Sequence, residues 1–152
     1  MNETTEMGTP PLRDRISFLA HRINAHLLRI TNPKLKIWGI DLTESRLLVS
    51  LLENGPLAAG DIVRIMALPQ STISHQLKRL EKRGYVRRTP GVHDSRVITA
   101  ELTESGRKVA IEGNMLSKEV TDRLVNAIGR EELEQLRAAM KRIDDALAPG
   151  AR

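Results

Sequence analysis

The pattern of apolar and polar positions between residues 69 and 83 predicts an amphipathic helix. Ile73, Leu77 and Leu80 recur at spacings of four and three, which places them on one face. The opposite face carries hydroxyl, imidazole and cationic side chains, namely Ser71, His75, Lys78 and Lys82, with Ser74 and Arg79 beside them. Pro69 suits the first helical turn, and Gly84 suits the left-handed residue that ends a helix. The helix therefore has one side for a core and one side for solvent or a partner.

The segment before this helix predicts a helix-turn-helix. Residues 58–68 carry a second, shorter helical pattern, and a break just before Pro69 separates the two helices. In a helix-turn-helix, the second helix can enter the DNA major groove with its N-terminal residues on base edges. Residues 69–83 are therefore a candidate recognition helix.

The segment after this helix predicts a β-hairpin. Residues 85–89 and 97–102 have the composition of short strands, and the loop over 90–96 is rich in turn-forming residues. A hairpin directly after a recognition helix is a wing. Arg96, near its tip, is placed to enter an adjacent minor groove, where negative potential is concentrated. Asp94 is expected to hold the Arg96 guanidinium by a charge-assisted hydrogen bond.

Longer helical patterns precede this region. Residues 12–31 carry apolar side chains at spacings of three and four, which predicts a long helix. Pro33 is expected to end it at Asn32, because a residue before proline resists the helical conformation. A connector over 34–41 follows, and Thr43 is expected to cap the next helix, which runs to about Glu53.

Two helical patterns follow the hairpin. Thr103 is expected to cap a helix that runs to about Ile128, and a last helix is predicted over 130–147. Apolar residues of that last helix repeat at 3-4-3-4 among mostly charged neighbours, namely Leu133, Leu136, Met140, Ile143 and Leu147. Such a narrow seam packs on another helix. That helix can belong to the same domain or to a second copy of the chain.

The charge of the chain is concentrated in the helix and the hairpin. From Arg64 to Arg96 there are eight basic and two acidic residues, net +6, whereas the whole chain carries +5, so the remainder sums to −1. The basic excess therefore lies where phosphates would be met. Aromatic residues make up only 2% of the chain, so its core must be aliphatic, which suits a mostly helical fold.

Several other classes of function lack their sequence signals. The chain has no cysteine, which excludes disulfides, thiolate catalysis and cysteine-ligated zinc. We find no phosphate-binding glycine loop, nucleophile elbow or zinc-helix motif, so we expect neither an enzyme nor a cofactor nor a metal site. His21 and His26 are five residues apart, which is not the usual spacing for a shared metal. Without a signal peptide or a long apolar run, a cytoplasmic location is expected.

The motifs between residues 57 and 107 resemble those of the MarR (multiple antibiotic resistance regulator) family. The resemblance covers about residues 12–147. Its most specific part is the wing sequence Asp94-Ser-Arg96 followed by Leu102-Thr-Glu-Ser-Gly-Arg107, together with Leu80-Glu-Lys-Arg-Gly-Tyr-Val86. One departure is Ala58-Ala59, where the family commonly has a Ser or Thr cap.

The resemblance implies a fold, a domain organisation and a function. The fold would be mostly α with a small β-wing: a winged helix-turn-helix domain over 42–102, dimerisation helices over 12–31 and 103–147, and a disordered segment over 1–11. The protein would be a homodimeric transcriptional regulator that binds a pseudo-palindromic operator in double-stranded DNA. It would usually be a repressor of an adjacent operon, released by a small molecule.

Candidate DNA-contacting residues follow from these patterns. Ser71, Ser74 and His75 are candidates for base edges, with Gln70 and Thr72 near the DNA backbone. Phosphate contacts are expected from Lys78, Arg79, Lys82, Arg87 and Arg88. Asp94 and Arg96 form the wing tip. The alternative is a winged-helix module whose basic helix meets an acidic protein, but serines and a histidine among the cations favour hydrogen bonding to bases.

The effector region is the least specific expectation. In the resembled family, ligands, often aromatic acids, bind between the dimerising helices and the winged domain. In this sequence, apolar and cationic residues would line that region, namely Phe18, His21, Arg22, His26, Arg29, Trp38, Arg46 and Met115. For any single one of these residues, an ordinary role in the core or on the surface is the favoured explanation. Together they suit a carboxylate or a thioester of an aromatic acid.

Overall fold

The computed structural model describes residues 8–150, which divide after Gly113 into two compact units that are considered separately. The predicted mostly helical fold with a small β-wing is confirmed. The elements are η1 (Leu12–Asp14), α2 (Ile16–Leu35), η2 (Lys36–Trp38), α3 (Leu42–Asn54), β1 (Leu57–Ala58), α4 (Ala59–Met66), α5 (Gln70–Lys82), β2 (Val86–Pro90), β3 (Ile98–Leu102), α6 (Glu104–Ile128) and α7 (Arg130–Leu147). The first seven residues of the segment predicted to be disordered lie outside the described range.

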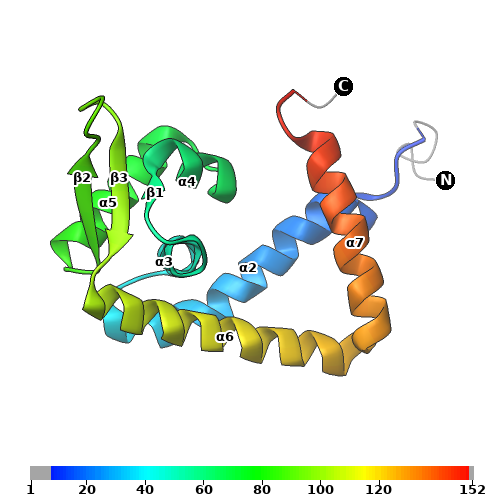
Figure 1. Ribbon diagram of the computed structural model, residues 1–152. Helices are drawn as coiled ribbons and strands as arrows, with labels where there is room; N and C mark the ends of the chain where they lie inside the picture. Colours follow the sequence, from blue (N-terminus) through cyan, green and yellow to red (C-terminus); the bar gives the residue numbers. More distant parts are fainter. Residues whose placement is uncertain (1–7, 151–152) are drawn as a thin grey trace. The chain divides into compact units, whose positions relative to one another are not determined.

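The winged domain packs α3, α4 and α5 beside a three-stranded antiparallel sheet of order β1-β3-β2 (Figure 1). β2 and β3 pair from Val86 with Leu102 to Pro90 with Ile98 and form the predicted hairpin. Its core is aliphatic, and each of these side chains is at most 2% exposed: Leu47, Leu48, Leu51, Ile62, Ile73, Leu77, Leu80, Val86 and Ala100. The inward face predicted for the helix over 69–83 is therefore confirmed at Ile73, Leu77 and Leu80.

The third strand, β1, was not predicted. Leu57 pairs with Ala100 and Ala58 with Thr99, so β1 extends the sheet on the other side of β3. A strand of two residues is too short to show an alternating pattern. The same Ala58 precedes α4, and its side chain makes no capping hydrogen bond, as its departure from the family pattern predicts.

The predicted end of the first helix at Asn32 is wrong. α2 continues through Pro33 to Leu35, and η2 follows until Gly39, whose φ of 69° ends it. The Asn32 side chain accepts a hydrogen bond from the Leu42 backbone N–H at 2.8 Å, which ties this end of α2 to the start of α3. Tertiary contacts thus outweigh the local penalty of one proline. The first helix also begins later than predicted, because residues 12–14 form η1.

Asp41, and not Thr43, caps α3. The Asp41 carboxylate accepts a hydrogen bond from the Glu44 backbone N–H at 2.8 Å, and Glu44 Oε2 accepts one from the Asp41 N–H at 3.1 Å. This reciprocal capping box satisfies two backbone donors at the start of the helix. Because the helix begins at Leu42, its start lies nearer to η2 than the sequence indicated.

The junction between the wing and α6 is fixed by polar contacts around Gly84. Thr103, as predicted, caps α6 through a hydrogen bond from the Gly106 N–H at 3.0 Å, and its hydroxyl also donates to the Gly84 carbonyl at 2.5 Å. Gly106 packs so closely on Tyr85 that a Cβ atom there would collide with the Tyr85 carbonyl oxygen. Gly84 itself has a φ of 78°, which confirms it as the left-handed residue after α5.

The second unit contains the end of α6 and all of α7, whose bounds match the prediction. Leu133 is 7% exposed, but the other members of the α7 seam stay exposed in the single chain, namely Leu136, Met140, Ile143 and Leu147. In the first unit, α2 likewise leaves Ile16, Leu19, Ile23 and Ile30 exposed. No helix among residues 8–150 is both long and apolar enough to cross a membrane.

Candidate DNA-binding surface

α5 presents the polar face that the sequence predicted. Ile73, Leu77 and Leu80 are at most 1% exposed, whereas Ser71, His75, Lys78 and Lys82 are exposed. Ser74 and Thr72 are half-buried beside them, and Gln70 at the start of the helix is exposed. The helix is therefore anchored by one face and free to meet a ligand with the other.

The turn before α5 sets the angle between the two helices. α4 ends at Ala67, which has a left-handed φ of 51°, and Pro69 takes the N-cap position with a φ of −57°. The Pro69 carbonyl accepts the first hydrogen bond of α5, from Ile73 N at 3.1 Å. Pro69 thus lies one position before the first helical residue, where its missing N–H has no cost.

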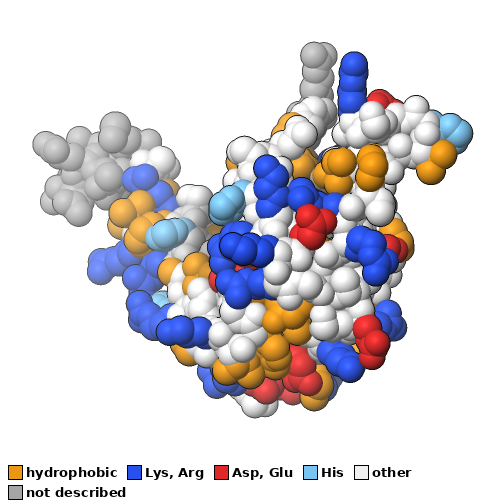
Figure 2. Space-filling view, turned by 90° about the vertical axis from the view of Figure 1, so that its left-hand side faces the viewer, with side chains coloured by type: hydrophobic (Ala, Val, Ile, Leu, Met, Phe, Trp, Pro, Cys, Tyr) orange, Lys and Arg blue, Asp and Glu red, His pale blue; other side chains and the backbone are white. Residues whose placement is uncertain are grey.

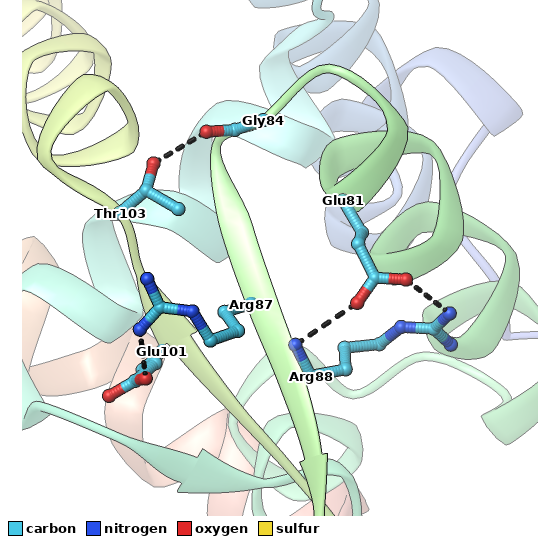
Figure 3. Close-up of polar contacts among 6 residues, drawn as sticks. All are labelled: Glu81, Gly84, Arg87, Arg88, Glu101 and Thr103. Carbon is cyan, nitrogen blue, oxygen red and sulfur yellow. Dashed lines mark hydrogen bonds and ion pairs between the residues drawn. The ribbon is translucent and has the colours of Figure 1, made fainter.

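Two arginines that were predicted to contact phosphate are held by acidic neighbours (Figure 3). Arg88 Nη2 donates to Glu81 Oε1 at 2.7 Å, and the Arg88 backbone N–H donates to Glu81 Oε2 at 3.1 Å, so β2 is tied to α5. Arg87 Nη1 donates to Glu101 Oε1 at 2.8 Å across the β2–β3 pair. The Arg88 hydrogen bond lowers the pKa of the Glu81 carboxyl below its ordinary value.

Arg79 is also paired, with a residue that the sequence did not identify. Its Nε lies 3.3 Å from Glu44 Oε1, and Glu44 is completely buried at the start of α3. Burial raises the pKa of Glu44 above its ordinary value. The sequence signal was the spacing of Asp41 and Glu44, which is that of a capping box.

Lys78 and Lys82 differ from these arginines. Among residues 8–150, no ion pair or hydrogen bond engages the side chains of Lys78 and Lys82. Figure 2, which views the molecule from the side of β2 and α5, shows basic side chains spread among fewer acidic ones. This distribution gives a surface suited to a polyanion.

The wing tip is exposed but is built differently from the prediction. Asp94 Oδ1 accepts a hydrogen bond from the Arg96 backbone N–H at 2.9 Å, and no ion pair joins it to the Arg96 guanidinium in the described part of the chain. The loop is closed by backbone hydrogen bonds from Gly91 N to Val97 O at 2.6 Å and from Val97 N to Asp94 O at 3.1 Å. Asp94 therefore shapes the loop and leaves the Arg96 side chain free to reach a partner. His93 is also exposed at this tip.

The candidate effector residues lie in different parts of the fold. The rings of Phe18 and His21 stack with centroids 5.9 Å apart, and Arg22, His26 and Arg29 belong to the same helix, α2. Arg46 Nη1 donates to Asn24 Oδ1 at 3.4 Å, which joins α3 to α2. The half-buried Trp38 accepts a hydrogen bond from the Tyr85 hydroxyl through its backbone carbonyl at 2.8 Å. Met115 is 59% exposed and belongs to the second unit.

A helix-turn-helix whose second helix exposes cations, followed directly by a β-hairpin, defines a winged helix-turn-helix protein. Residues 38–97 match the model of the MarR family. The chain is 32% identical over 105 residues to the transcriptional regulator FarR of Neisseria gonorrhoeae, an alignment that covers 67% of this chain and 72% of FarR.

Solved structures show the same fold. A structure of the S. aureus MepR–DNA complex superposes with a TM-score of 0.79 and 25% identity, over 88% of this chain and 98% of MepR. BpsR of Bordetella bronchiseptica, described for the regulation of its DNA binding by 6-hydroxynicotinic acid, superposes with a TM-score of 0.80 and 18% identity over 91% and 99% of the two chains. The chain belongs to the MarR family and is a DNA-binding transcriptional regulator.

Proposed function

We propose that this protein is a homodimeric repressor that binds a pseudo-palindromic operator, with α5 in the major groove and the wing in the minor groove. The carrying observation is the exposed face of α5, where His75, Lys78 and Lys82 stand opposite a fully buried apolar face. The resemblance of the fold to a MepR structure that was solved with DNA supports this assignment. The role is that of a regulator and not of an enzyme.

The contacts divide by chemistry. Ser71, Ser74 and His75 lie on the first turns of α5, the part of a recognition helix that meets base edges. Lys82, near the end of the helix, and Lys78 supply charge for phosphates and so act on all sequences alike. Arg96 supplies the minor-groove contact from the wing tip. Arg87 and Arg88 contribute mainly by stiffening the wing, because acidic partners hold both.

A second copy of the chain would cover the exposed apolar residues. α7 exposes Leu136, Met140 and Ile143 along one seam, each between 43% and 53% exposed, and α2 exposes Ile16 and Ile23, at 65% and 55%. A row of exposed apolar residues along a helix, as each of these helices has, is typical of an interface. A two-fold dimer would present two α5 helices to half-sites about one helical turn of DNA apart, about 10 bp.

We further propose that a small anionic ligand, an aromatic acid or its coenzyme A thioester, releases the operator. The stacked pair of Phe18 and His21 offers an aromatic surface, and cationic side chains of α2 lie along the same helix. Such a ligand acts only if it binds the free dimer more tightly than the DNA-bound dimer. Thermal shift with aromatic acids, followed by release of the protein from DNA, tests this. Ligands that raise the Tm without changing DNA affinity would show binding without regulation.

The DNA-binding proposal is tested by fluorescence anisotropy with fragments of the DNA that adjoins the gene. We expect saturable binding to one fragment, which a scrambled duplex of the same length displaces poorly. A matched pair of variants assigns the surface. His75→Ala should reduce the preference for the specific fragment, and Lys82→Ala should lower the affinity for both duplexes equally. Equal weakening of both duplexes by both variants would place the base-reading surface elsewhere.

A further inference from the structure

A buried carboxylate faces the recognition helix from the start of α3. Glu44 is 0% exposed, and only one of its oxygens is needed for the capping box, since Oε2 accepts from the Asp41 N–H at 3.1 Å. The other oxygen, Oε1, is buried and has no hydrogen-bond partner among the described residues. What lies beside it is a cation, Arg79 Nε, at 3.3 Å. Helix capping therefore explains the position of Oε2 but not that of Oε1.

The charge of Glu44 is balanced from the recognition helix and its C-terminal end. A buried carboxylate is costly unless cations and hydrogen bonds compensate it. The cations near Glu44 are Arg79 and Arg83, which are four residues apart and so lie on one side of that helix. Arg83 reaches the same corner, because a Cβ atom on Gly39 would collide with its Nη1. Arg79 on the recognition helix and Arg83 at its C-cap therefore both lie near the junction between η2 and α3.

The pairing leaves part of Arg79 available. The guanidinium has five N–H donors in a rigid planar fork, and its contact with Glu44 is made at the Nε donor. The Arg79 side chain is 44% exposed, and no described residue pairs with its terminal Nη1 or Nη2. A guanidinium that is ion-paired at Nε is biased towards one orientation, and its terminal nitrogens can then bond a phosphate. By contrast, Lys78 and Lys82 have flexible side chains that no residue within 8–150 pairs with.

We propose that Glu44 is a positioning residue for DNA binding: it orients the Arg79 guanidinium so that its terminal nitrogens bond a backbone phosphate. The inference rests on the proposed operator binding and assigns one of its contacts. It also gives the three paired arginines different roles, since Arg87 and Arg88 are held by Glu101 and Glu81, which are themselves 37% and 38% exposed, and Arg79 is held by a fully buried group.

Glu44→Gln tests this proposal because two explanations predict opposite signs. Glutamine keeps an oxygen for the Asp41 N–H but loses the charge that orients Arg79. Loss of orientation should weaken operator binding about tenfold, which corresponds to one charge-assisted hydrogen bond. Simple removal of a negative charge near DNA should instead strengthen binding. Unchanged or tighter binding by Glu44→Gln would overturn the proposal.

A double-mutant cycle separates positioning from general damage. Arg79→Ala should weaken binding and reduce the slope of log affinity against log salt by about 0.9 for each phosphate that is no longer neutralised. Adding Glu44→Gln to Arg79→Ala should then weaken binding no further, because the residue that Glu44 orients is gone. Additive losses in the double variant would contradict the proposal.

A second variant, Arg79→Lys, tests the same contact with Glu44 intact, so that the result does not depend on how Glu44→Gln folds. Arg79→Lys retains the charge and the partner of Glu44 but lacks the planar fork, so we expect it to bind nearly as weakly as Arg79→Ala. Arg123→Lys makes the same exchange at an exposed residue of α6 that is not a candidate DNA contact, so it is the matched control and should bind like wild type. Wild-type affinity in Arg79→Lys would overturn the proposal. Failure of the wild-type protein to bind any operator fragment would overturn the proposed function as well, so the two failures are distinguishable.

Discussion

Arg88 and Lys82 are both basic residues of the candidate surface, but we expect their removal to damage different properties. Arg88→Ala should lower the free energy of unfolding and leave the salt slope of DNA binding nearly unchanged. Lys82→Ala should leave the free energy of unfolding nearly unchanged and reduce the salt slope of DNA binding. The reason is that Glu81 holds Arg88 on β2, whereas Lys82 has no ion pair among the described residues.

The size of the Arg88 effect follows from its side-chain contact with Glu81, because the 3.1 Å bond from the Arg88 backbone N–H remains in Arg88→Ala. The 2.7 Å bond joins side chains that are 25% and 38% exposed. Exposed ion pairs contribute about 0.2–1 kcal/mol, and hydrogen bonds to charged groups about 1.5–3 kcal/mol. An intermediate environment gives about 1 kcal/mol for Arg88→Ala, which lowers the Tm by about 2–4 °C for a chain of this size. Lys82→Ala should stay within about 0.5 kcal/mol.

Urea denaturation measures the free energy of unfolding, and fluorescence anisotropy at several salt concentrations measures the salt slope of DNA binding. Lys82→Ala should reduce the slope by about 0.9 for each phosphate that is no longer neutralised, hence about 1.8 for a dimer. Arg87→Ala serves as a control for an exposed pair and should cost less stability than Arg88→Ala. If Arg88→Ala keeps wild-type stability and reduces the slope, then Arg88 contacts phosphate and the structural role assigned to it is wrong.

The pH dependence of the stability difference between wild type and Arg88→Ala provides an independent check. Arg88 lowers the folded-state pKa of Glu81 below its ordinary value of about 4.5. An acid whose pKa is lowered by folding contributes stability that is complete above its unfolded pKa. The stability difference between wild type and Arg88→Ala should therefore be constant above about pH 5.5 and shrink as the pH falls below 4.5 through the folded value. A difference that grows on acidification would contradict the pairing.

Three further outcomes are expected. His75→Ala should cost about 1–3 kcal/mol on the specific operator and little on random DNA, as measured by competition, if it bonds a base. Arg96→Ala should weaken operator binding without lowering the Tm, and Asp94→Ala should give a milder defect because it loosens the loop; wild-type affinity in Arg96→Ala would mean that the wing does not reach DNA. Deletion of residues from Arg130 onward should give a monomeric or aggregated protein in sedimentation, and a soluble dimer would contradict the role proposed for α7.

The periodic parts of this chain could be predicted from the sequence. The apolar face of α5 and the bounds of α7 follow from a 3.6-residue repeat over several turns, and the hairpin follows from turn residues between two short β-branched segments. Thr103 and Gly84 were identifiable because caps and left-handed stops have few alternatives in residue type. These features depend on neighbours in sequence.

The parts that could not be predicted depend on contacts between distant residues. α2 continues past Pro33, where the Asn32 side chain bonds the Leu42 N–H ten residues away. β1 exists only because β3 pairs with it. For the site, exposure of the α5 cations could be predicted, but not which arginines are paired, since Glu44 on α3 and Arg79 on α5 are distant in sequence and meet only in the folded chain. Charge counting alone treats a paired arginine and a free lysine as equal.

A salt titration of operator binding tests the central claim most directly. Two recognition helices and wings that neutralise about 6–10 phosphates should give a linear plot of log affinity against log salt, and a loss of affinity of about 10³–10⁵ between 50 and 200 mM salt. The specific duplex should stay tighter than a scrambled duplex throughout. A nearly flat plot, or equal affinity for both duplexes, would contradict the assignment of α5 and the wing as a sequence-specific DNA-binding surface.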